Sequence, residues 1–147
     1  MLAEAESAGT KVLLPTDHVV AAEFDKDAEA SIVAGDIPEG LMGLDIGPET
    51  CQTFADVLAA AQTIVWNGPM GVFEWEAFRT GTAAVGEAVA RASEGAAVGI
   101  VGGGDTAAAA ELLGVADRVS HVSTGGGASL AMLEGSPMPG LAAVAEK

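Results

Sequence analysis

Three glycine-rich segments of this sequence combine backbone freedom with oxygen-bearing side chains. They cover residues 67–71 (NGPMG), 102–106 (GGGDT) and 123–127 (STGGG). Glycine lets a backbone approach a ligand closely and adopt positive φ. The second and third segments also precede predicted helices, whose free N–H groups and positive dipole end attract anions. Together the segments indicate a phosphate or other anion site, although each alone is also compatible with a tight turn in which Asp105, Ser123 or Thr124 caps a helix.

Short apolar runs alternate with helical periodicity around these segments. Pro48 suits the first position of one helix, and Gly95 suits the end of another. Near-continuous apolar strands alternating with helices predict an α/β fold: a Rossmann-like, three-layer parallel sheet with helices on both faces. The predicted strands are 11–14, 19–22, 31–33, 63–66, 97–101 and 119–122, and the predicted helices are 48–60, 81–93, 105–113 and 126–133.

The carboxyl ends of parallel strands share one edge of a sheet, and ligands bind outside that edge in open α/β sheets. We therefore expect strands near 11–14, 63–67, 97–101 and 119–122 to lie parallel, with all three glycine segments at the same edge. The spacing matches neither the P-loop nor the dinucleotide fingerprint. The segment 136–140, with two prolines and a glycine, predicts no regular structure.

Charge and composition narrow the function further. Six Lys and Arg oppose 21 Asp and Glu in the 147 residues, giving a formal net charge of −15. Nucleic-acid and anionic-membrane partners are disfavoured, because both require basic surfaces. A phosphate would have to be held by backbone N–H groups, helix N-termini or a metal ion. The bulk acidity is equally compatible with a role in solubility or with a salty habitat.

The single cysteine, Cys51, excludes an internal disulfide and fits a reducing compartment. The first seven residues carry acids where a secretory signal carries Lys or Arg, and no apolar run approaches the roughly 20 residues needed to span a bilayer. The cytoplasm is therefore the default expectation.

Other residues carry weaker signals. His18 and His121 lack the spacing of metal ligands, and His121 falls in an apolar strand, where a core position is predicted. Cys51 lies on a predicted helix without an activating partner. Glu74 follows a glycine loop beside aromatic residues, and it is either an acceptor for a ribose hydroxyl or a solvated surface acid.

Four longer motifs extend the interpretation. They are GLDIGPET (43–50), WNGPMGVFE (66–74), VGGGDT (101–106) and HVSTGGGASL (121–130). Their residues, their order along the chain and the spacing between them resemble those of the phosphoglycerate kinase family. The similarity runs from about Lys11 to the C-terminal tail. The resemblance departs at Ala131, where the family usually has an acidic residue.

The resemblance implies reversible phosphoryl transfer between 1,3-bisphosphoglycerate with ADP and 3-phosphoglycerate with ATP, assisted by Mg²⁺. Such chemistry depends on positioning and charge stabilisation rather than a covalent protein group. By family likeness, the catalytic N–H groups would be those of Gly104 and Gly127, and Asp105 would bind the metal. The implied nucleotide-binding residues are Gly43, Asn67, Pro69, Glu74, Gly103, Gly104, Asp105, Thr106, Ser123, Thr124, Gly125 and Gly126.

A complete family member is more than twice as long as this chain. Residues 1–147 are therefore expected to form the C-terminal part of a nucleotide-binding domain, incomplete relative to the family, without the N-terminal substrate domain, the phosphate-contacting lysine or much of the adenine pocket. The acidic, alanine-rich stretch from Met1 is read as a cut through a longer protein. The expected partners are a nucleotide and the missing N-terminal portion, and the chain alone is expected to be inactive. A non-catalytic nucleotide-binding module and a folding fragment without ligand are the alternatives.

Overall fold

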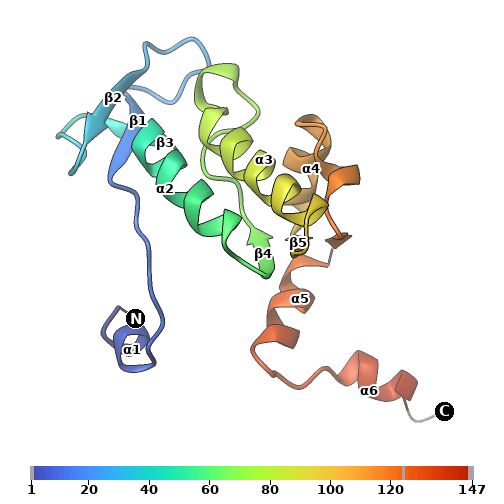
Figure 1. Cartoon of the computed structure of the whole chain (residues 1–147). Helices are drawn as coiled ribbons and strands as arrows, with labels where there is room; N and C mark the ends of the chain where they lie inside the picture. Colours follow the sequence, from blue (N-terminus) through green and yellow to red (C-terminus); the bar gives the residue numbers. More distant parts are fainter. Residues whose placement is uncertain (1, 124, 146–147) are drawn as a thin grey trace.

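The computed structural model describes residues 2–123 and 125–145, in which two three-stranded sheets lie beside a group of helices (Figure 1). The strands are β1 (Asp17–Ala21), β2 (Ser31–Ala34), β3 (Met42–Ile46), β4 (Thr63–Asn67), β5 (Val98–Gly102) and β6 (His121–Ser123). The α-helices are α1 (Leu2–Ser7), α2 (Pro48–Ala59), α3 (Thr80–Glu94), α4 (Gly104–Leu112), α5 (Gly126–Leu133) and α6 (Pro139–Ala145), and the 3-10 turns are η1 (Glu76–Phe78) and η2 (Ala116–Arg118).

The sheet formed by β4, β5 and β6 is parallel, with β5 in the centre. Its register pairs Asn67 with Gly102 and Gly102 with Ser123, so the three strands end side by side. Each strand continues into one of the glycine segments. The predicted α/β fold and the common edge of the three segments are therefore confirmed.

The other sheet, ordered β2-β1-β3, is antiparallel. Sequence patterning predicted β1 and β2 but missed β3, because its residues MGLDI contain glycine and a charged acid, which strands disfavour. The strand predicted at 11–14 is wrong: after a turn at residues 8–9, residues 10–16 form an extended connection from α1 to β1 (Figure 1). Val12 and Leu14 are exposed there, and the run is stopped by Pro15.

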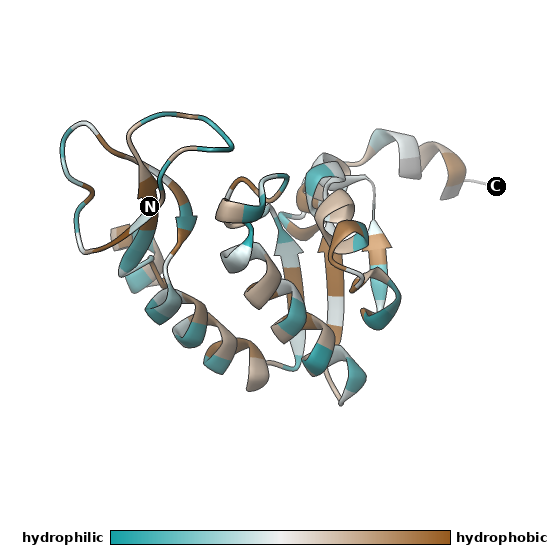
Figure 2. Ribbon diagram, turned by 90° about the horizontal axis from the view of Figure 1, so that it is seen from above, coloured by the Kyte–Doolittle hydropathy of each residue, from teal (hydrophilic) through white to brown (hydrophobic). Residues whose placement is uncertain are grey.

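One face of the parallel sheet forms the main core. Ile64 and Trp66 of β4 and Val101 of β5 pack there with Val85 and Val89 of α3. Burial alternates along β4, so Val65 points to the opposite face, where it is 40% exposed. That opposite face is flanked by α5, whereas α2, α3 and α4 belong to the core side (Figure 2). Within the described residues, helices therefore lie on both faces, but the second face is only partly covered.

Two buried carboxylates tie the antiparallel sheet to helix starts. Asp17 of β1 accepts hydrogen bonds from the backbone N–H groups of Glu49 (3.0 Å) and Thr50 (2.8 Å) and from the Thr50 hydroxyl, all at the beginning of α2. Asp45 of β3 accepts from the N–H of Gly81 (2.6 Å) at the beginning of α3. The acids satisfy helix N–H groups that otherwise lack partners.

The pKa values of these two acids move in opposite directions. Burial opposes ionisation of Asp17, but its hydrogen bonds from Thr50 and Glu49 outweigh that cost and hold its pKa below the ordinary value. Burial raises the pKa of Asp45, and the hydrogen bonds from Gly81 and Ile46 do not fully offset it.

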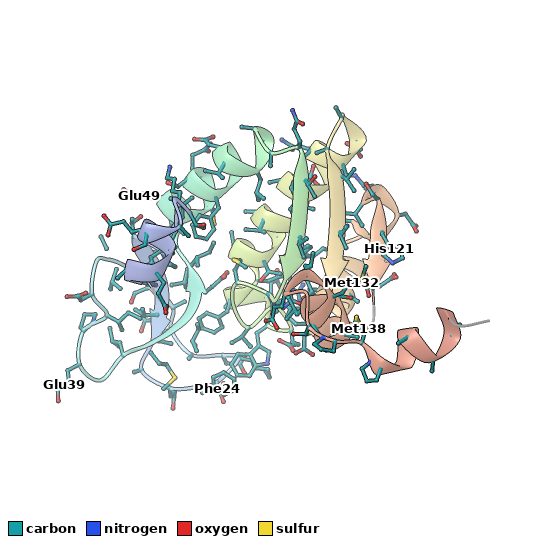
Figure 3. The ribbon with its side chains drawn as sticks, turned by 90° about the horizontal axis from the view of Figure 1, so that it is seen from below. Phe24, Glu39, Glu49, His121, Met132 and Met138 are labelled. Carbon is teal, nitrogen blue, oxygen red and sulfur yellow. The ribbon has the colours of Figure 1, made fainter. Side chains whose placement is uncertain are left out.

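The C-terminal part departs from expectation at one point. The helix α6 begins at Pro139, inside the segment predicted to lack regular structure. Proline is tolerated in the first turn of a helix, because the N–H it removes has no intrahelical partner there. Figure 3 shows α6 extending away from the sheets. None of the described helices combines the length and apolar character that crossing a membrane requires.

Candidate functional site

The three glycine segments converge at the carboxyl edge of the parallel sheet. The N–H of Gly68 donates to the Thr106 hydroxyl (2.7 Å), which joins the first segment to the second. The N–H of Gly103 donates to the carbonyl of Ser123 (3.2 Å), which joins the second to the third. The Met70 and Gly71 N–H groups donate to the buried Thr82 hydroxyl, which fixes the first segment against α3.

The second and third segments pack so closely that glycine is required. A Cβ atom placed on Gly126 would lie 2.6 Å from the Cα of Gly103, much closer than real Cβ atoms approach backbone. Gly103 itself has a φ of 94°, in the region that side chains disfavour. By contrast, Cβ atoms on Gly104 and Gly127 would meet nothing within 4 Å, so these two positions face open space.

Helices α4 and α5 begin at this edge without side-chain caps. Their N-cap residues are Gly103 and Gly125, and neither can supply a side-chain acceptor. Among the described residues, no hydrogen bond engages the backbone N–H of Gly104, Gly126 or Gly127. These N–H groups and the two helix dipoles are thus available to an anion.

The capping alternative is wrong for Asp105 and Ser123. Asp105 lies in the first turn of α4 rather than at its N-cap. The Ser123 hydroxyl accepts from the N–H of Gly125 (3.3 Å) and lies 3.0 Å from the Ser129 hydroxyl, so it shapes the turn before α5. Thr124 lies outside the described residues.

Asp105 is exposed, and no hydrogen bond or ion pair engages its carboxylate in the described part of the chain. Those residues contain no cluster of three or more potential metal ligands. A single free carboxylate beside free helix N–H groups suits Mg²⁺, which is commonly held by one or two carboxylates together with substrate phosphates and water. The donor set therefore fits a nucleotide-borne magnesium ion rather than a dedicated protein cage.

The remaining predicted residues of this edge lie in or near the first segment. Asn67 ends β4 with an exposed side chain, and its Oδ1 would lie 3.2 Å from a Cβ placed on Gly103. Pro69 is half-buried in the following turn. The structure therefore brings together Asn67, Pro69, Gly103, Gly104, Asp105, Thr106, Ser123, Gly125, Gly126 and Gly127.

Glu74 and Gly43 are positioned differently. Glu74 is exposed and lines a hollow of about 630 Å³ together with Lys26, Trp75 and Arg79. Gly43 lies on β3 of the antiparallel sheet, where the Ile37 side chain occupies the space above it. Within the part of the chain that the structure describes, no hydrogen bond or ion pair joins either residue to the glycine segments, so their place in one site stays a prediction.

Sequence reasoning missed two cations beside Glu74. Arg79 donates from Nε to the carbonyl of Phe73 (2.6 Å) and from Nη2 to that of Glu74 (3.0 Å), which holds the backbone of this loop. Lys26 comes from the connection between β1 and β2 and pairs with Asp27. Arg79 lies only five residues after Glu74, whereas no local pattern links Lys26 to Glu74, because tertiary folding alone brings their segments together.

The side chains of Arg118 and Arg91 do not supply hydrogen-bond donors at the carboxyl edge of the parallel sheet. Arg118 donates to Glu87 and Glu94, and Arg91 donates to Glu87, all on the surface of α3 and η2. These hydrogen bonds from Arg118 and Arg91 lower the pKa of Glu87 to about 2. The two arginines are thus committed to ion pairs away from the glycine segments.

Two residues weighed as nucleophile or base have other environments. The prediction that His121 lies in the core is wrong, because it projects from β6 onto the partly covered face and is exposed; Figure 3 labels it with Met132 of α5. Burial raises the pKa of the half-buried Cys51 thiol, and the negative charges of Asp45 and Asp17 raise it further. A thiol held in its protonated form is a poor nucleophile.

Comparison with known proteins gives a consistent answer. The pattern of the family described as "Phosphoglycerate kinase" matches residues 1–136. Phosphoglycerate kinase of Lactobacillus acidophilus is 54% identical over 142 residues, which are 97% of this chain and 35% of that protein. Phosphoglycerate kinase of Clostridium perfringens (strain SM101) is 55% identical over 148 residues, covering 100% of this chain and 36% of the relative. The chain belongs to the phosphoglycerate kinase family.

Solved phosphoglycerate kinases share its fold. The Coxiella burnetii enzyme superposes with a TM-score of 0.85 at 44% identity, covering 92% of this chain and 35% of that one. The Pyrococcus horikoshii enzyme superposes with a TM-score of 0.73 at 34% identity, and the match covers 88% of this chain and 31% of that one. The match falls in the C-terminal portion of the relatives, and the chain spans about a third of their length.

Proposed function

We propose that this chain supplies the nucleotide side of a phosphoglycerate kinase, which transfers a phosphoryl group reversibly between 1,3-bisphosphoglycerate with ADP and 3-phosphoglycerate with ATP. The observation that supports this most strongly is the pair of uncapped helix starts, α4 and α5, at one sheet edge in a chain of this family. Residues 1–147 then form the C-terminal part of the nucleotide-binding domain, and the remainder of the enzyme is the partner that carries the acyl-phosphate substrate.

In this proposal, the N–H groups of Gly104 and Gly127 face the transferring phosphoryl group. Both positions open onto free space, and preorganised donors aimed at developing charge are the main catalytic device for such a transfer. Gly103, Thr106, Ser123, Gly125 and Gly126 shape the cradle for the nucleotide phosphates, and Thr124 is proposed as a further nucleotide contact. The net charge of −15 makes these backbone donors more important, because the acids around them repel a phosphate.

Asp105 would hold the Mg²⁺ that accompanies ATP or ADP. When bound, the ion neutralises phosphate charge and orients the phosphates for in-line transfer. The carboxylate of Asp105 has no internal partner to displace, so binding the ion costs no existing hydrogen bond among the described residues.

Glu74 would accept hydrogen bonds from the ribose, with Asn67, Pro69 and Gly43 beside the nucleotide. The Arg79 bonds to the backbone at Phe73 and Glu74 support this role by fixing the loop that carries the acid. A relative from Triticum aestivum, 52% identical, is named "Phosphoglycerate kinase, cytosolic", which supports a cytoplasmic location for this chain as well.

A chimera tests the proposal. The matched 142-residue region of the Lactobacillus acidophilus enzyme is replaced by this chain, and phosphoglycerate-dependent ATP consumption is measured in a coupled assay. We expect turnover. A chimera that binds ATP without turnover would instead support a non-catalytic nucleotide-binding module.

A pair of substitutions at Gly104 makes the test specific. Gly104 is the first residue of α4, and the preceding Gly103 has a ψ of 147°, so proline fits there. Gly104→Pro deletes the N–H, whereas Gly104→Ala keeps it and meets no neighbour within 4 Å. We expect Gly104→Pro to lower kcat by about 10²–10³, as for the loss of one oxyanion donor, and Gly104→Ala to stay near the parent. Equal damage by both substitutions would assign Gly104 a steric role instead.

A further inference from the structure

Thr82 is a fully buried threonine that the proposed site does not use. It is the third residue of α3, and its exposed fraction is 0%. Its hydroxyl oxygen accepts hydrogen bonds from the N–H groups of Met70 (3.1 Å) and Gly71 (3.3 Å), the last two residues of the first glycine segment. Among the described residues, no other acceptor engages either N–H group. The hydroxyl therefore holds a part of the chain that would otherwise carry two half-buried donors without a partner.

The segment held by Thr82 continues directly into the loop that carries Glu74. The next N–H, that of Val72, donates to the carbonyl of Leu44 on β3 (2.9 Å). The three consecutive N–H groups of residues 70–72 are thus all satisfied by α3 and β3. Glu74 follows only two residues later, so its position depends on where these hydrogen bonds place the chain.

Close packing makes the position of this segment specific. A Cβ atom placed on Gly71 would collide with the carbonyl of Leu44 and with the carboxylate of Asp45. The same carboxylate accepts from the N–H of Gly81, the residue before Thr82. The start of α3, strand β3 and the end of the first glycine segment therefore form one packed unit. Packed interiors of this kind adopt discrete arrangements rather than deforming continuously.

Two threonines hold opposite ends of the turn at Pro69. Each is the third residue of its helix, Thr106 in α4 and Thr82 in α3. Thr106 accepts from the N–H of Gly68 at one end, and Thr82 accepts from that of Gly71 at the other. Thr106 belongs to the second glycine segment and hence to the proposed site, whereas Thr82 lies behind the turn in the interior.

We propose that Thr82 is a positioning residue for nucleotide binding, whose hydroxyl holds the turn at Pro69 and the loop to Glu74 in the conformation that receives the nucleotide. This inference rests on the proposed function for the identity of the ligand. Without the hydroxyl, the loop occupies that conformation for a smaller fraction of the time, and the apparent Kd rises in inverse proportion to that fraction. Once the nucleotide is bound the loop is in place, so kcat is preserved.

Two substitutions at Thr82 in the chimera separate the hydroxyl from the shape of the side chain. Thr82→Val keeps the branched shape and loses the hydroxyl, whereas Thr82→Ser keeps the hydroxyl. We expect Thr82→Val to raise the KM for MgATP and the Kd for MgADP by about 10-fold, with kcat and the KM for 3-phosphoglycerate within about twofold of the parent. Thr82→Ser should stay within about twofold of the parent throughout. A Thr82→Val chimera with the parent's KM and Kd, or an equal rise in both variants, would overturn the proposal.

Thr50 supplies a matched control from the antiparallel sheet. It is 1% exposed at the start of α2, and its hydroxyl likewise accepts from two backbone N–H groups, those of Thr16 (3.0 Å) and Asp17 (3.2 Å). We expect Thr50→Val to lower the melting temperature of the chimera at least as far as Thr82→Val does, and to leave the KM and Kd unchanged. A comparable rise in KM and Kd for Thr50→Val would trace the effect to lost stability and refute the positioning role.

Amide hydrogen exchange tests the hydrogen bonds without nucleotide or turnover. The amides of Met70 and Gly71 should exchange about 10-fold faster in the Thr82→Val chimera than in the parent, because a bonded N–H exchanges only after local opening. The amide of Val72 donates to Leu44 and serves as the internal control, with less change. Unprotected Met70 and Gly71 amides in the parent would contradict the proposal.

The possible failures can be told apart. An active chimera whose Thr82→Val variant keeps the parent's KM and Kd would refute the positioning role and leave the proposed function intact. A chimera that binds MgADP without turnover, and binds it more weakly after Thr82→Val, would support the positioning role and refute the kinase function. A chimera that neither binds MgADP nor turns over would refute both.

Discussion

Helices α2 and α3 begin in a different way from helices α4 and α5. The first pair starts against buried carboxylates supplied by the antiparallel sheet, Asp17 for α2 and Asp45 for α3. The second pair starts at Gly103 and Gly125, directly after parallel strands, with no side-chain acceptor. All four helix starts offer the same free N–H groups and the same positive dipole end.

The difference shows how one physical property serves two purposes. Where the chain needs rigidity, an internal anion satisfies the helix start and is itself buried. Where we propose that a ligand binds, no internal anion is provided and the glycines leave the approach open. A helix start that is unsatisfied in the protein thus distinguishes the candidate site from its scaffold, although both have similar sequence-level signals.

The largest expected effect is the loss of activity in the isolated chain, which has the open helix starts of α4 and α5 but not the rest of the proposed site. We expect the isolated chain to have no measurable phosphoglycerate kinase activity, because in the proposed function the acyl-phosphate substrate is held by the other portion of the enzyme. The family resemblance implies that two or three strong nucleotide contacts lie there as well. At roughly 1.5–3 kcal/mol each, their absence costs about 3–9 kcal/mol, or roughly two to six decades of ATP affinity. Calorimetric titration with MgATP measures this, and micromolar binding with turnover would contradict it.

The next effect concerns the helix starts that donate to an internal carboxylate, here α2 with Asp17. Asp17→Ala leaves the buried N–H of Thr50 without its acceptor, while the Thr50 hydroxyl loses the carboxylate and keeps the carbonyl of residue 17 (3.2 Å). We expect the free energy of unfolding to fall by about 3 kcal/mol, given that hydrogen bonds to a charged group contribute roughly 1.5–3 kcal/mol each. Urea unfolding of the chimera measures it, with Asp105→Ala as the control, for which a change within about 0.5 kcal/mol is expected. Comparable losses for both variants would erase the distinction between the two kinds of helix start.

Asp105→Asn in the chimera should have a smaller and purely functional effect. The amide keeps the size of the side chain but loses the negative charge that a hard cation prefers. We expect the KM for MgATP to rise about 10- to 100-fold, corresponding to roughly 1.4–2.7 kcal/mol, while the melting temperature stays nearly unchanged. A variant that loses stability and keeps its KM would show that Asp105 serves the helix rather than the metal.

The smallest effect compares the two buried acids. The folded-state pKa of Asp17 is lowered, so its contribution to stability is present above its ordinary value of 3.8 and is lost as pH falls through the folded pKa. The folded-state pKa of Asp45 is raised, so its contribution is present below 3.8 and is lost as pH rises through the folded pKa. At pH 7, Asp45→Asn should therefore cost no more than about 1 kcal/mol, less than Asp17→Asn, in urea unfolding measured from pH 3 to 7. An Asp45→Asn loss that exceeds the Asp17→Asn loss at pH 7 would be inconsistent with these directions.

Much of the parallel sheet could be predicted because its signals are local. Apolar runs at 63–66 and 97–101 are followed by glycine turns and then by helical periodicity, and each boundary lies within two residues of the observed one. The convergence of the three glycine segments followed from the rule that parallel strands share a carboxyl edge. Pro48 and Gly95 marked the start of α2 and the end of α3 as their backbone chemistry predicts.

The features that sequence reasoning missed depend on tertiary partners. Strand β3 is held by its pairing with β1 and by the hydrogen bonds of Asp45, none of which leaves a periodic trace. The exposure of His121 depends on how much of the second sheet face is covered, which a strand pattern cannot show. Lys26 reaches Glu74 from the distant connection between β1 and β2, so the two residues could not be associated from spacing.

The positions of the two tryptophans give the molecule two separate optical reporters. The chain contains no tyrosine, so Trp66 and Trp75 dominate its near-ultraviolet absorption and emission. Trp66 is almost fully buried beneath α3, and its indole N–H donates to the carbonyl of Gly68 in the first glycine segment (2.9 Å). Trp75 adjoins Glu74, and the centroid of its ring lies 4.5 Å from that of Phe24. Figure 3 labels Phe24 at the antiparallel sheet. A single-tryptophan version of the chain would therefore assign a fluorescence change on nucleotide addition either to the glycine edge or to the Glu74 loop.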